Sequence, residues 1–102
     1  MSMGMAGNEQ ALIGSWKNGN NPDLDFMVSF YGDHRVVIRL MGETVTGHWH
    51  VENRSCMMVL EPEKLRMNLR NFSVSSDTLF YFSDSGEPNS RNGKREFLIR
   101  VK

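Results

Sequence analysis

The stretch FMVSFYGDHRVVIRLMGETVTGHWHVE, residues 26–52, decides the fold of this chain. Apolar and polar side chains alternate along it with a period of two, which is the pattern of half-buried β-strands. Residues 32–34 interrupt the alternation as a three-residue turn, and residues 42–43 interrupt it as a two-residue turn. The sequence therefore predicts two consecutive antiparallel hairpins, and residues 53–54 are expected to form the turn of a third.

The three turns can be checked against one another, because each turn sets which residues face each other across its hairpin. A one-residue error in any turn would move apolar side chains to the wrong face of the sheet. All three turns instead place one apolar set on one face. The expected pairs are Phe30–Val36, Val28–Ile38, Phe26–Leu40, Leu40–Val45, Ile38–Gly47, Val36–Trp49, Val51–Cys56, Trp49–Met58 and Gly47–Leu60. This agreement predicts a meander whose strands share one inner face.

The same strand pattern continues on both sides of this stretch. Eight strands are expected, at residues 11–18, 25–31, 35–41, 44–52, 55–61, 65–74, 78–83 and 94–101. The sixth strand changes its apolar parity between Leu69 and Phe72, so a β-bulge near Arg70 and Asn71 would bend it, or it would split into two short strands. Asn8 is expected to cap a short helical turn before the first strand. Short strands joined by tight turns indicate an all-β barrel or sandwich.

The composition fits one domain of 102 residues, with 12 basic and 12 acidic residues and a formal net charge of zero. Because the charges are mixed along the chain and form no basic stripe, nucleic-acid binding is not expected. No membrane span and no secretory leader are expected either, because no apolar run of the required kind occurs. Residues 1–7 are interpreted as a flexible terminus or a cloning remnant, and residues 8–102 as the single domain.

Cys56 is the only cysteine, so no disulfide can form within the chain. A single thiol fits a reducing compartment, and it also survives in an oxidising one when it is buried. The sequence as written predicts a cytoplasmic protein, and it predicts a periplasmic or envelope-associated protein if a leader was removed.

The segment LIGSWK, residues 12–17, opens the first strand with the triplet Gly14-Ser15-Trp16. A Gly-x-Trp triplet at the start of an eight-stranded meander resembles the lipocalin-like, or calycin-type, β-barrels. The chain is shorter than full-sized lipocalins and lacks their Asp-Tyr motif and disulfides, so it is most similar to compact lipocalin-like domains of small bacterial proteins. The resemblance implies that Trp16 closes one end of the barrel and that an arginine of the last strand, Arg100 in preference to Arg95, lies over its ring.

The interior of an eight-stranded barrel is either filled by side chains or holds one small ligand. The expected inward side chains are Phe26, Phe30, Val36, Ile38, Leu40, Trp49, Met58 and Leu60, joined by Trp16, Phe97, Ile99 and Val101. A fully packed core is one interpretation, because such bulky side chains would fill so short a barrel. The alternative is a small apolar pocket at the open end. Its candidate lining residues are Trp16, Phe26, Phe30, Trp49 and Met58.

Two expected strands are apolar on both faces, which is typical of strands that are covered on both sides. They contain the segments SCMMVLE, residues 55–61, and TLFYFSD, residues 78–84. The candidate partner surface consists of their outward side chains Met57, Val59, Phe80 and Phe82. A protein partner or a second copy of the chain would cover this surface. The alternative is that another segment of the same chain covers it.

His48 and His50 flank Trp49 and are expected to face outward, on the opposite side of the sheet from Cys56. Their spacing suits two metal ligands, with Met57 across from His50 as a soft third. Arg35 is expected beside His50, and a cationic neighbour disfavours a metal there. Surface histidines without a metal are therefore the preferred interpretation, and these three residues are weak candidates for ligands.

The sequence contains no recognisable set of catalytic acid, base and nucleophile, and no phosphate loop or paired-cysteine motif. Neither an enzyme nor a cofactor is therefore expected. The first hypothesis is a non-enzymatic binding module that contacts a protein partner, or a second copy of itself as a homodimer, through its apolar outer strand face. The second hypothesis is a carrier of a small hydrophobic ligand at the barrel mouth, and the third is a soft-metal binding protein.

Overall fold

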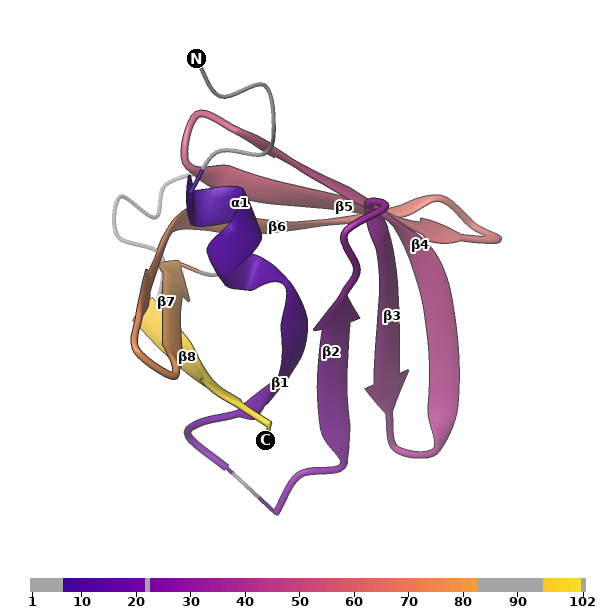
Figure 1. Cartoon of the computed structure of the whole chain (residues 1–102). Helices are drawn as coiled ribbons and strands as arrows, with labels where there is room; N and C mark the ends of the chain where they lie inside the picture. Colours follow the sequence, from indigo (N-terminus) through magenta and orange to yellow (C-terminus); the bar gives the residue numbers. More distant parts are fainter. Residues whose placement is uncertain (1–6, 22, 83–94, 102) are drawn as a thin grey trace, which may run out of the picture.

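The computed structural model describes residues 7–21, 23–82 and 95–101. Within these residues one short helix, α1 (Gly7–Leu12), precedes eight strands. The strands are β1 (Gly14–Asn18), β2 (Phe26–Phe30), β3 (Arg35–Leu40), β4 (Glu43–Glu52), β5 (Ser55–Glu61), β6 (Leu65–Ser75), β7 (Thr78–Phe82) and β8 (Arg95–Arg100). Each strand pairs antiparallel with the next and β8 pairs with β1, so the sheet closes into a barrel (Figure 1). The predicted all-β, eight-stranded antiparallel meander barrel with a short N-terminal helical turn is confirmed.

The helix begins one residue earlier than the predicted cap. Because α1 starts at Gly7, Asn8 lies within its first turn and not before it. The helix also occupies residues 11–12, which were expected to be the start of the first strand. The segment predicted to be a flexible terminus lies outside the described residues except for Gly7.

The first and third hairpins have the predicted registers. Phe30 pairs with Val36 in the first, and Val51 pairs with Cys56 in the third. The turn of the third hairpin lies at residues 53–54, whose φ values are 51° and 64°. Positive φ at both central residues is the geometry of a two-residue hairpin turn whose twist matches that of the flanking strands.

The predicted turn of the second hairpin was wrong. The turn lies at Met41-Gly42, with φ values of 52° and 84°, and Leu40 pairs with Glu43 instead of Val45. All residue pairs between β3 and β4 are therefore shifted by two residues from the prediction. Because side chains alternate with a period of two, a shift of two residues leaves every side chain on its predicted face. The inner face is consequently as predicted although the register is not, but Leu40, which was expected inside, is 44% exposed at the end of β3.

The sixth strand contains the predicted irregularity. Its register against β7 shifts between Arg70 and Ser73, and Asn71 has a φ of 49°. Leu69 before the shift and Phe72 after it are both buried. The bulge thus turns both halves of one long strand toward the core, as the parity change in the sequence indicated.

The inner face of β8 differs from the prediction. Leu98 is buried in the core, and Glu96, two residues away, shares its face. Phe97 and Ile99, which were expected inside, lie on the outer face, where Phe97 packs beside Phe80 at 6.1 Å between ring centroids. The prediction failed because this strand carries apolar side chains at both parities, so alternation alone could not assign its faces.

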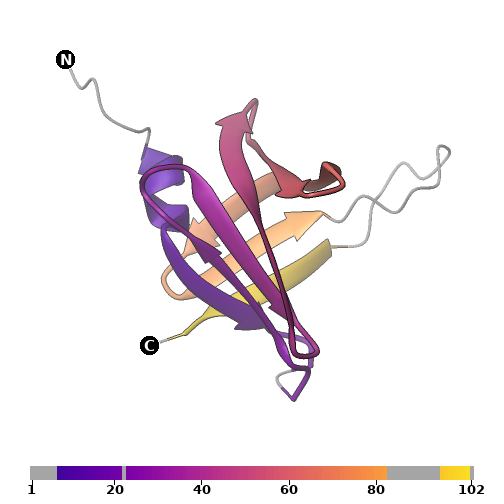
Figure 2. The same cartoon turned by 90° about the vertical axis from the view of Figure 1, so that its right-hand side faces the viewer.

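The core lies inside the barrel and beneath α1, which covers one end of it (Figures 1 and 2). Leu12 of the helix is fully buried in this core. Among the buried side chains are Trp16, Val28, Phe30, Val36, Ile38, Trp49, Cys56, Met58, Leu60, Leu69, Phe72, Leu79 and Leu98. Within the described ranges, no helix is long and apolar enough to cross a membrane.

Candidate functional site

The Trp16 side chain fills the end of the barrel beneath α1. It is fully buried, and its Nε1 donates a hydrogen bond of 2.9 Å to the carbonyl oxygen of Leu12. The Arg100 guanidinium lies over the Trp16 ring at 4.2 Å from its centroid, which is a cation–π contact. The contact implied by the lipocalin resemblance is thus present in the structure.

Arg100 also donates hydrogen bonds to backbone carbonyl groups at the C-terminal end of the short helix. Its Nη2 donates to the carbonyl oxygen of Ala11 at 2.9 Å, and its Nη1 donates to that of Ile13 at 3.0 Å. Carbonyl groups at a helix C-terminus have no partner within the helix, and a cation there complements the helix dipole. Gly14 has a φ of 132°, and a Cβ at this position would lie 2.6 Å from Arg100 Nη1. A side chain at Gly14 would therefore displace Arg100, which explains the glycine of the Gly-x-Trp triplet.

A second aromatic group packs on the same side of the core. Trp49 is buried, its ring meets that of Phe30 edge-on at 5.3 Å, and its Nε1 donates to the carbonyl oxygen of Tyr31 at 3.1 Å. The His34 ring lies 5.1 Å from the Trp49 ring, and His34 Nε2 lies 3.7 Å from Glu9 Oε2 on the helix. These contacts join the first hairpin loop to α1 and complete the closed end of the barrel.

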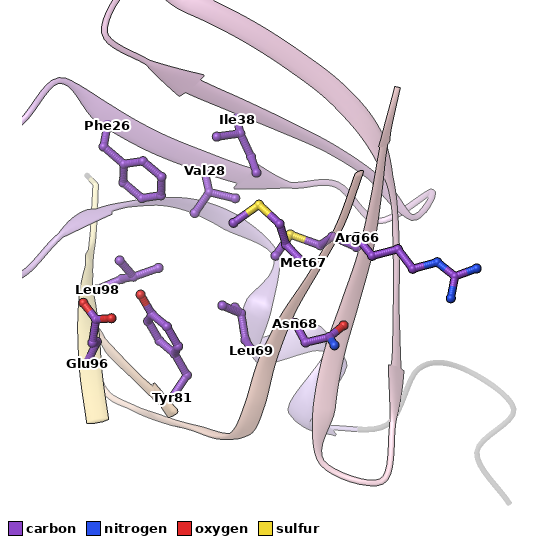
Figure 3. Close-up of a pocket in the computed structure, with 11 residues that line it drawn as sticks. Phe26, Val28, Ile38, Arg66, Met67, Asn68, Leu69, Tyr81, Glu96 and Leu98 are labelled. Carbon is purple, nitrogen blue, oxygen red and sulfur yellow. The ribbon is translucent and has the colours of Figure 1, made fainter. Parts of the chain in front are cut away.

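A cavity of about 380 Å³ lies elsewhere in the barrel interior (Figure 3). Its lining comes from six strands and is mostly apolar. The lining residues are Phe26, Val28, Ile38, Met58, Arg66, Met67, Asn68, Leu69, Tyr81, Glu96 and Leu98. The cavity reaches the surface, because Met67 on its wall is 39% exposed. This opening is the barrel mouth.

The structure divides the five residues expected to line a pocket into two groups. Phe26 and Met58 line the cavity. Trp16, Phe30 and Trp49 do not line it, because they are packed into the closed end. Large aromatic side chains were assigned to the pocket because they are inward-facing, but inward position alone does not separate a filled end of a barrel from an open one.

None of the four polar residues of the cavity lining, Arg66, Asn68, Tyr81 and Glu96, was assigned to a pocket from the sequence. Tyr81 and Glu96 pair across β7 and β8, and both side chains point into the cavity (Figure 3). Burial, and secondarily the negative charge of Glu96, raises the pKa of Tyr81 to about 12. The Tyr81 hydroxyl is therefore protonated at neutral pH and able to donate a hydrogen bond. Glu96 lies two residues from Leu98, so the two side chains share a face, and this could have placed Glu96 inside the barrel. The apolar residues on the other face of the same strand obscured this signal.

The candidate partner surface consists of two separate apolar pairs. Met57 and Val59 are half-buried on the outer face of β5, and Phe80 and Phe82 are half-buried on the outer face of β7. Strand β6 lies between β5 and β7 in the sheet. The residues of β6 opposite Met57, Val59 and Phe80 are Asn68, Arg66 and Ser73. A row of polar side chains thus separates the two pairs, and the four residues do not form one continuous patch.

The histidines face outward on β4, as their parity predicts. Because of the shifted register, Arg35 pairs with His48, and the expectation that it flanks His50 was wrong. His50 pairs with Met57, and its Nε2 lies 3.9 Å from Glu52 Oε1. Throughout the described part of the chain, no three His, Cys, Asp or Glu side chains come together in a way that could hold a metal ion.

Cys56 lies inside the barrel and is fully buried. Burial, with a smaller contribution from the charge of Glu9, raises the pKa of the Cys56 thiol to about 12. The thiolate is the nucleophilic form, so the thiol is unreactive at neutral pH in the folded protein.

The barrel therefore has one end filled by Trp16, Arg100 and α1, and a cavity whose wall carries Tyr81 and Glu96. The cavity is the concave, mainly apolar kind of site that small ligands occupy. Comparisons of the chain with protein-family models, with curated proteins and with solved structures find no match.

Proposed function

We propose that the protein is a non-enzymatic binding module that holds one small, mainly apolar ligand in the cavity at the barrel mouth. The observation that carries this proposal is a cavity of about 380 Å³ with a largely aliphatic and aromatic wall. Ligand pockets in proteins span roughly 300 to 1,000 Å³, so the cavity is at the small end of this range.

The proposal includes kinship with the lipocalin-like barrels. It is supported by the closed eight-stranded meander and by the Arg100 guanidinium over the Trp16 ring. In this arrangement Trp16 and α1 fill one end of the barrel, while the strand ends around Phe26 and Met67 form a mouth.

The size of the cavity limits the affinity. A ligand that buries about 200 Å² of apolar surface gains about 5 kcal/mol at roughly 25 cal/mol/Å². A gain of about 5 kcal/mol corresponds to a dissociation constant of about 0.2 mM. Since association also costs translational and side-chain freedom, a purely apolar ligand is expected to bind more weakly than this. A tighter natural ligand would need polar contacts with the cavity wall in addition.

The test uses N-phenyl-1-naphthylamine, an uncharged probe whose fluorescence rises when it leaves water. We expect its emission to rise on addition of the protein, and we expect Met67→Trp to reduce this rise severalfold by blocking the mouth. The matched control is Met57→Trp, which places the same side chain on the outer face of the neighbouring strand. A silent probe, or equal binding by wild type and Met67→Trp, would contradict the proposal.

A second candidate function is contact with a protein partner or a second copy of the chain. It is favoured by the half-buried Phe80–Phe97 pair on the outer face, over which Arg95 lies at 4.6 Å from the Phe80 ring centroid. Aromatic residues and arginine are enriched at protein interfaces. Light scattering at high protein concentration tests self-association, and a strict monomer would leave only a foreign partner.

A further inference from the structure

The cavity wall carries a negative charge at one point. Glu96 on β8 points to the same side as buried Leu98, and its strand partner Tyr81 points to the same side as buried Leu79. Figure 3 shows the Glu96 carboxylate and the Tyr81 hydroxyl next to each other on one side of the cavity. The rest of the wall around them is mostly apolar.

Among the described residues, no cationic side chain neutralises the Glu96 carboxylate. The ion pairs found among residues 7–21, 23–82 and 95–101 do not include Glu96. Arg66 is the only described cationic residue along the cavity wall, and its side chain extends away from the cavity (Figure 3). The Tyr81 hydroxyl is protonated, so it supplies a hydrogen-bond donor but no positive charge.

A carboxylate partly removed from water favours a partner that brings a compensating charge or a strong donor. A ligand with an apolar body and a protonated amine can contact the apolar wall and the Glu96 carboxylate at the same time. The body occupies the aliphatic part near Val28, Ile38 and Leu69, and the ammonium group lies against Glu96. A ligand with a carboxylate head would instead bring two negative charges together.

We propose that Glu96 makes this cavity selective for small amphiphiles that carry a protonated amine. This inference rests on the proposed function, since it names the ligand class of the same cavity. The cavity volume of about 380 Å³ is at the small end of the range for ligand pockets, which favours compact ligands such as short alkylamines and arylalkylamines.

The experiment compares three ligands with the same eight-carbon chain at neutral pH: octylamine, 1-octanol and octanoate. Their dissociation constants are measured by displacement of N-phenyl-1-naphthylamine and by calorimetry. We expect octylamine to bind about tenfold more tightly than 1-octanol, the ratio that one charge-assisted hydrogen bond provides, and octanoate to bind most weakly.

The decisive variant is Glu96→Gln, which keeps the shape of the side chain and removes its charge. We expect the ratio of the 1-octanol to the octylamine dissociation constant to fall from about ten to about two or less. Glu52→Gln is the matched control, because Glu52 is an exposed carboxylate on the outer face of β4. This control is expected to keep the wild-type ratio.

The outcomes separate the two proposals. If 1-octanol binds but octylamine has no advantage, or if octanoate binds best, the amine selectivity is wrong and the cavity proposal stands. An octylamine advantage that persists in Glu96→Gln also overturns the inference, because the selectivity then comes from another group. If none of the three ligands binds and the uncharged probe is silent, both proposals fail.

Discussion

At the end of the barrel under α1, the Arg100 guanidinium donates to the carbonyl oxygens of Ala11 and Ile13 and lies over the Trp16 ring. At the mouth, the Glu96 carboxylate lies on a mostly apolar wall, and the described residues provide no cation beside it. Both groups are charged and partly withdrawn from water. Arg100 has its partners within the chain, whereas Glu96 has no cationic partner among the described residues.

This difference between Arg100 and Glu96 indicates that the closed end and the mouth of the barrel have different roles. A half-buried charge contributes to stability when it donates hydrogen bonds to carbonyl groups that would otherwise be unpaired. A charge on a cavity wall without such partners contributes little stability and is typical of a site that recognises something else. The comparison therefore predicts that substitutions at the closed end damage folding, whereas substitutions at the mouth change binding.

The largest expected effect comes from Trp16→Ala. Removing a fully buried tryptophan leaves a cavity and an unpaired Leu12 carbonyl, so the free energy of unfolding should fall by about 3–5 kcal/mol. Phe26→Ala at the mouth is the matched truncation, and it should cost about 1–2 kcal/mol because Phe26 is only half-buried. Denaturant unfolding followed by far-UV circular dichroism measures both. Equal losses would remove the distinction between the two ends.

An intermediate effect is expected from Arg100→Met, which keeps an apolar stem and removes the guanidinium. The carbonyl oxygens of Ala11 and Ile13 lose their donors, so the free energy of unfolding should fall by about 2–3 kcal/mol. Glu96→Gln should change it by no more than about 0.5 kcal/mol. Chemical denaturation of the two variants in parallel is the measurement. A Glu96→Gln loss as large as that of Arg100→Met would mean that Glu96 is a structural residue.

The last expected effect is absent at neutral pH and appears only as a loss of stability at alkaline pH. The pKa of Tyr81 is about 12 in the folded protein against 10.0 for an unperturbed tyrosine. Below pH 10 the phenol is protonated in both states, so its full contribution is present. Between about pH 10 and 12 the unfolded chain loses this proton first, and stability should fall as pH rises through this window.

The measurement is the free energy of unfolding of wild type and Tyr81→Phe at several pH values. The difference between the two should grow from pH 10 to 12, because the variant lacks the titrating phenol. Tyr31→Phe is the control on an exposed tyrosine, and it should retain the wild-type fall. A Tyr81→Phe curve parallel to the wild-type curve would contradict a buried phenol beside a charged Glu96.

Much of the fold followed from local pattern. Alternation through residues 26–60 predicted which side chains face inward, and Trp49, Met58 and Leu60 are indeed buried. The parity change after Leu69 predicted the bulge in β6. These inferences succeed because the side chains of a strand repeat every two residues, so a buried face leaves a direct trace in the sequence.

The candidate site was less accessible from the sequence. Expecting Phe97 inside conflicted with expecting Arg100 over Trp16, since residues 97 and 100 of one strand lie on opposite faces. Taking Arg100 as the inner residue would have placed Leu98 and Glu96 inside with it. The three-residue motif at residues 14–16 therefore indicated which face of β8 points inward. The sequence of β8 did not, because apolar residues occur on both of its faces.

The sequence by itself determined the number of strands and the inner face of the meander, because these depend on alternation and turn residues, and the resemblance at residues 14–16 implied the Trp16–Arg100 pair. Only the tertiary structure decided the pairing of Leu40 with Glu43, the separation of a filled end from an open mouth, and the meeting of Tyr81 with Glu96 in the cavity. The physical reason is that a shift of two residues preserves every face, so local pattern cannot distinguish one register from the next. The shape of the interior depends on where all eight strands end relative to one another, which closure of the barrel sets.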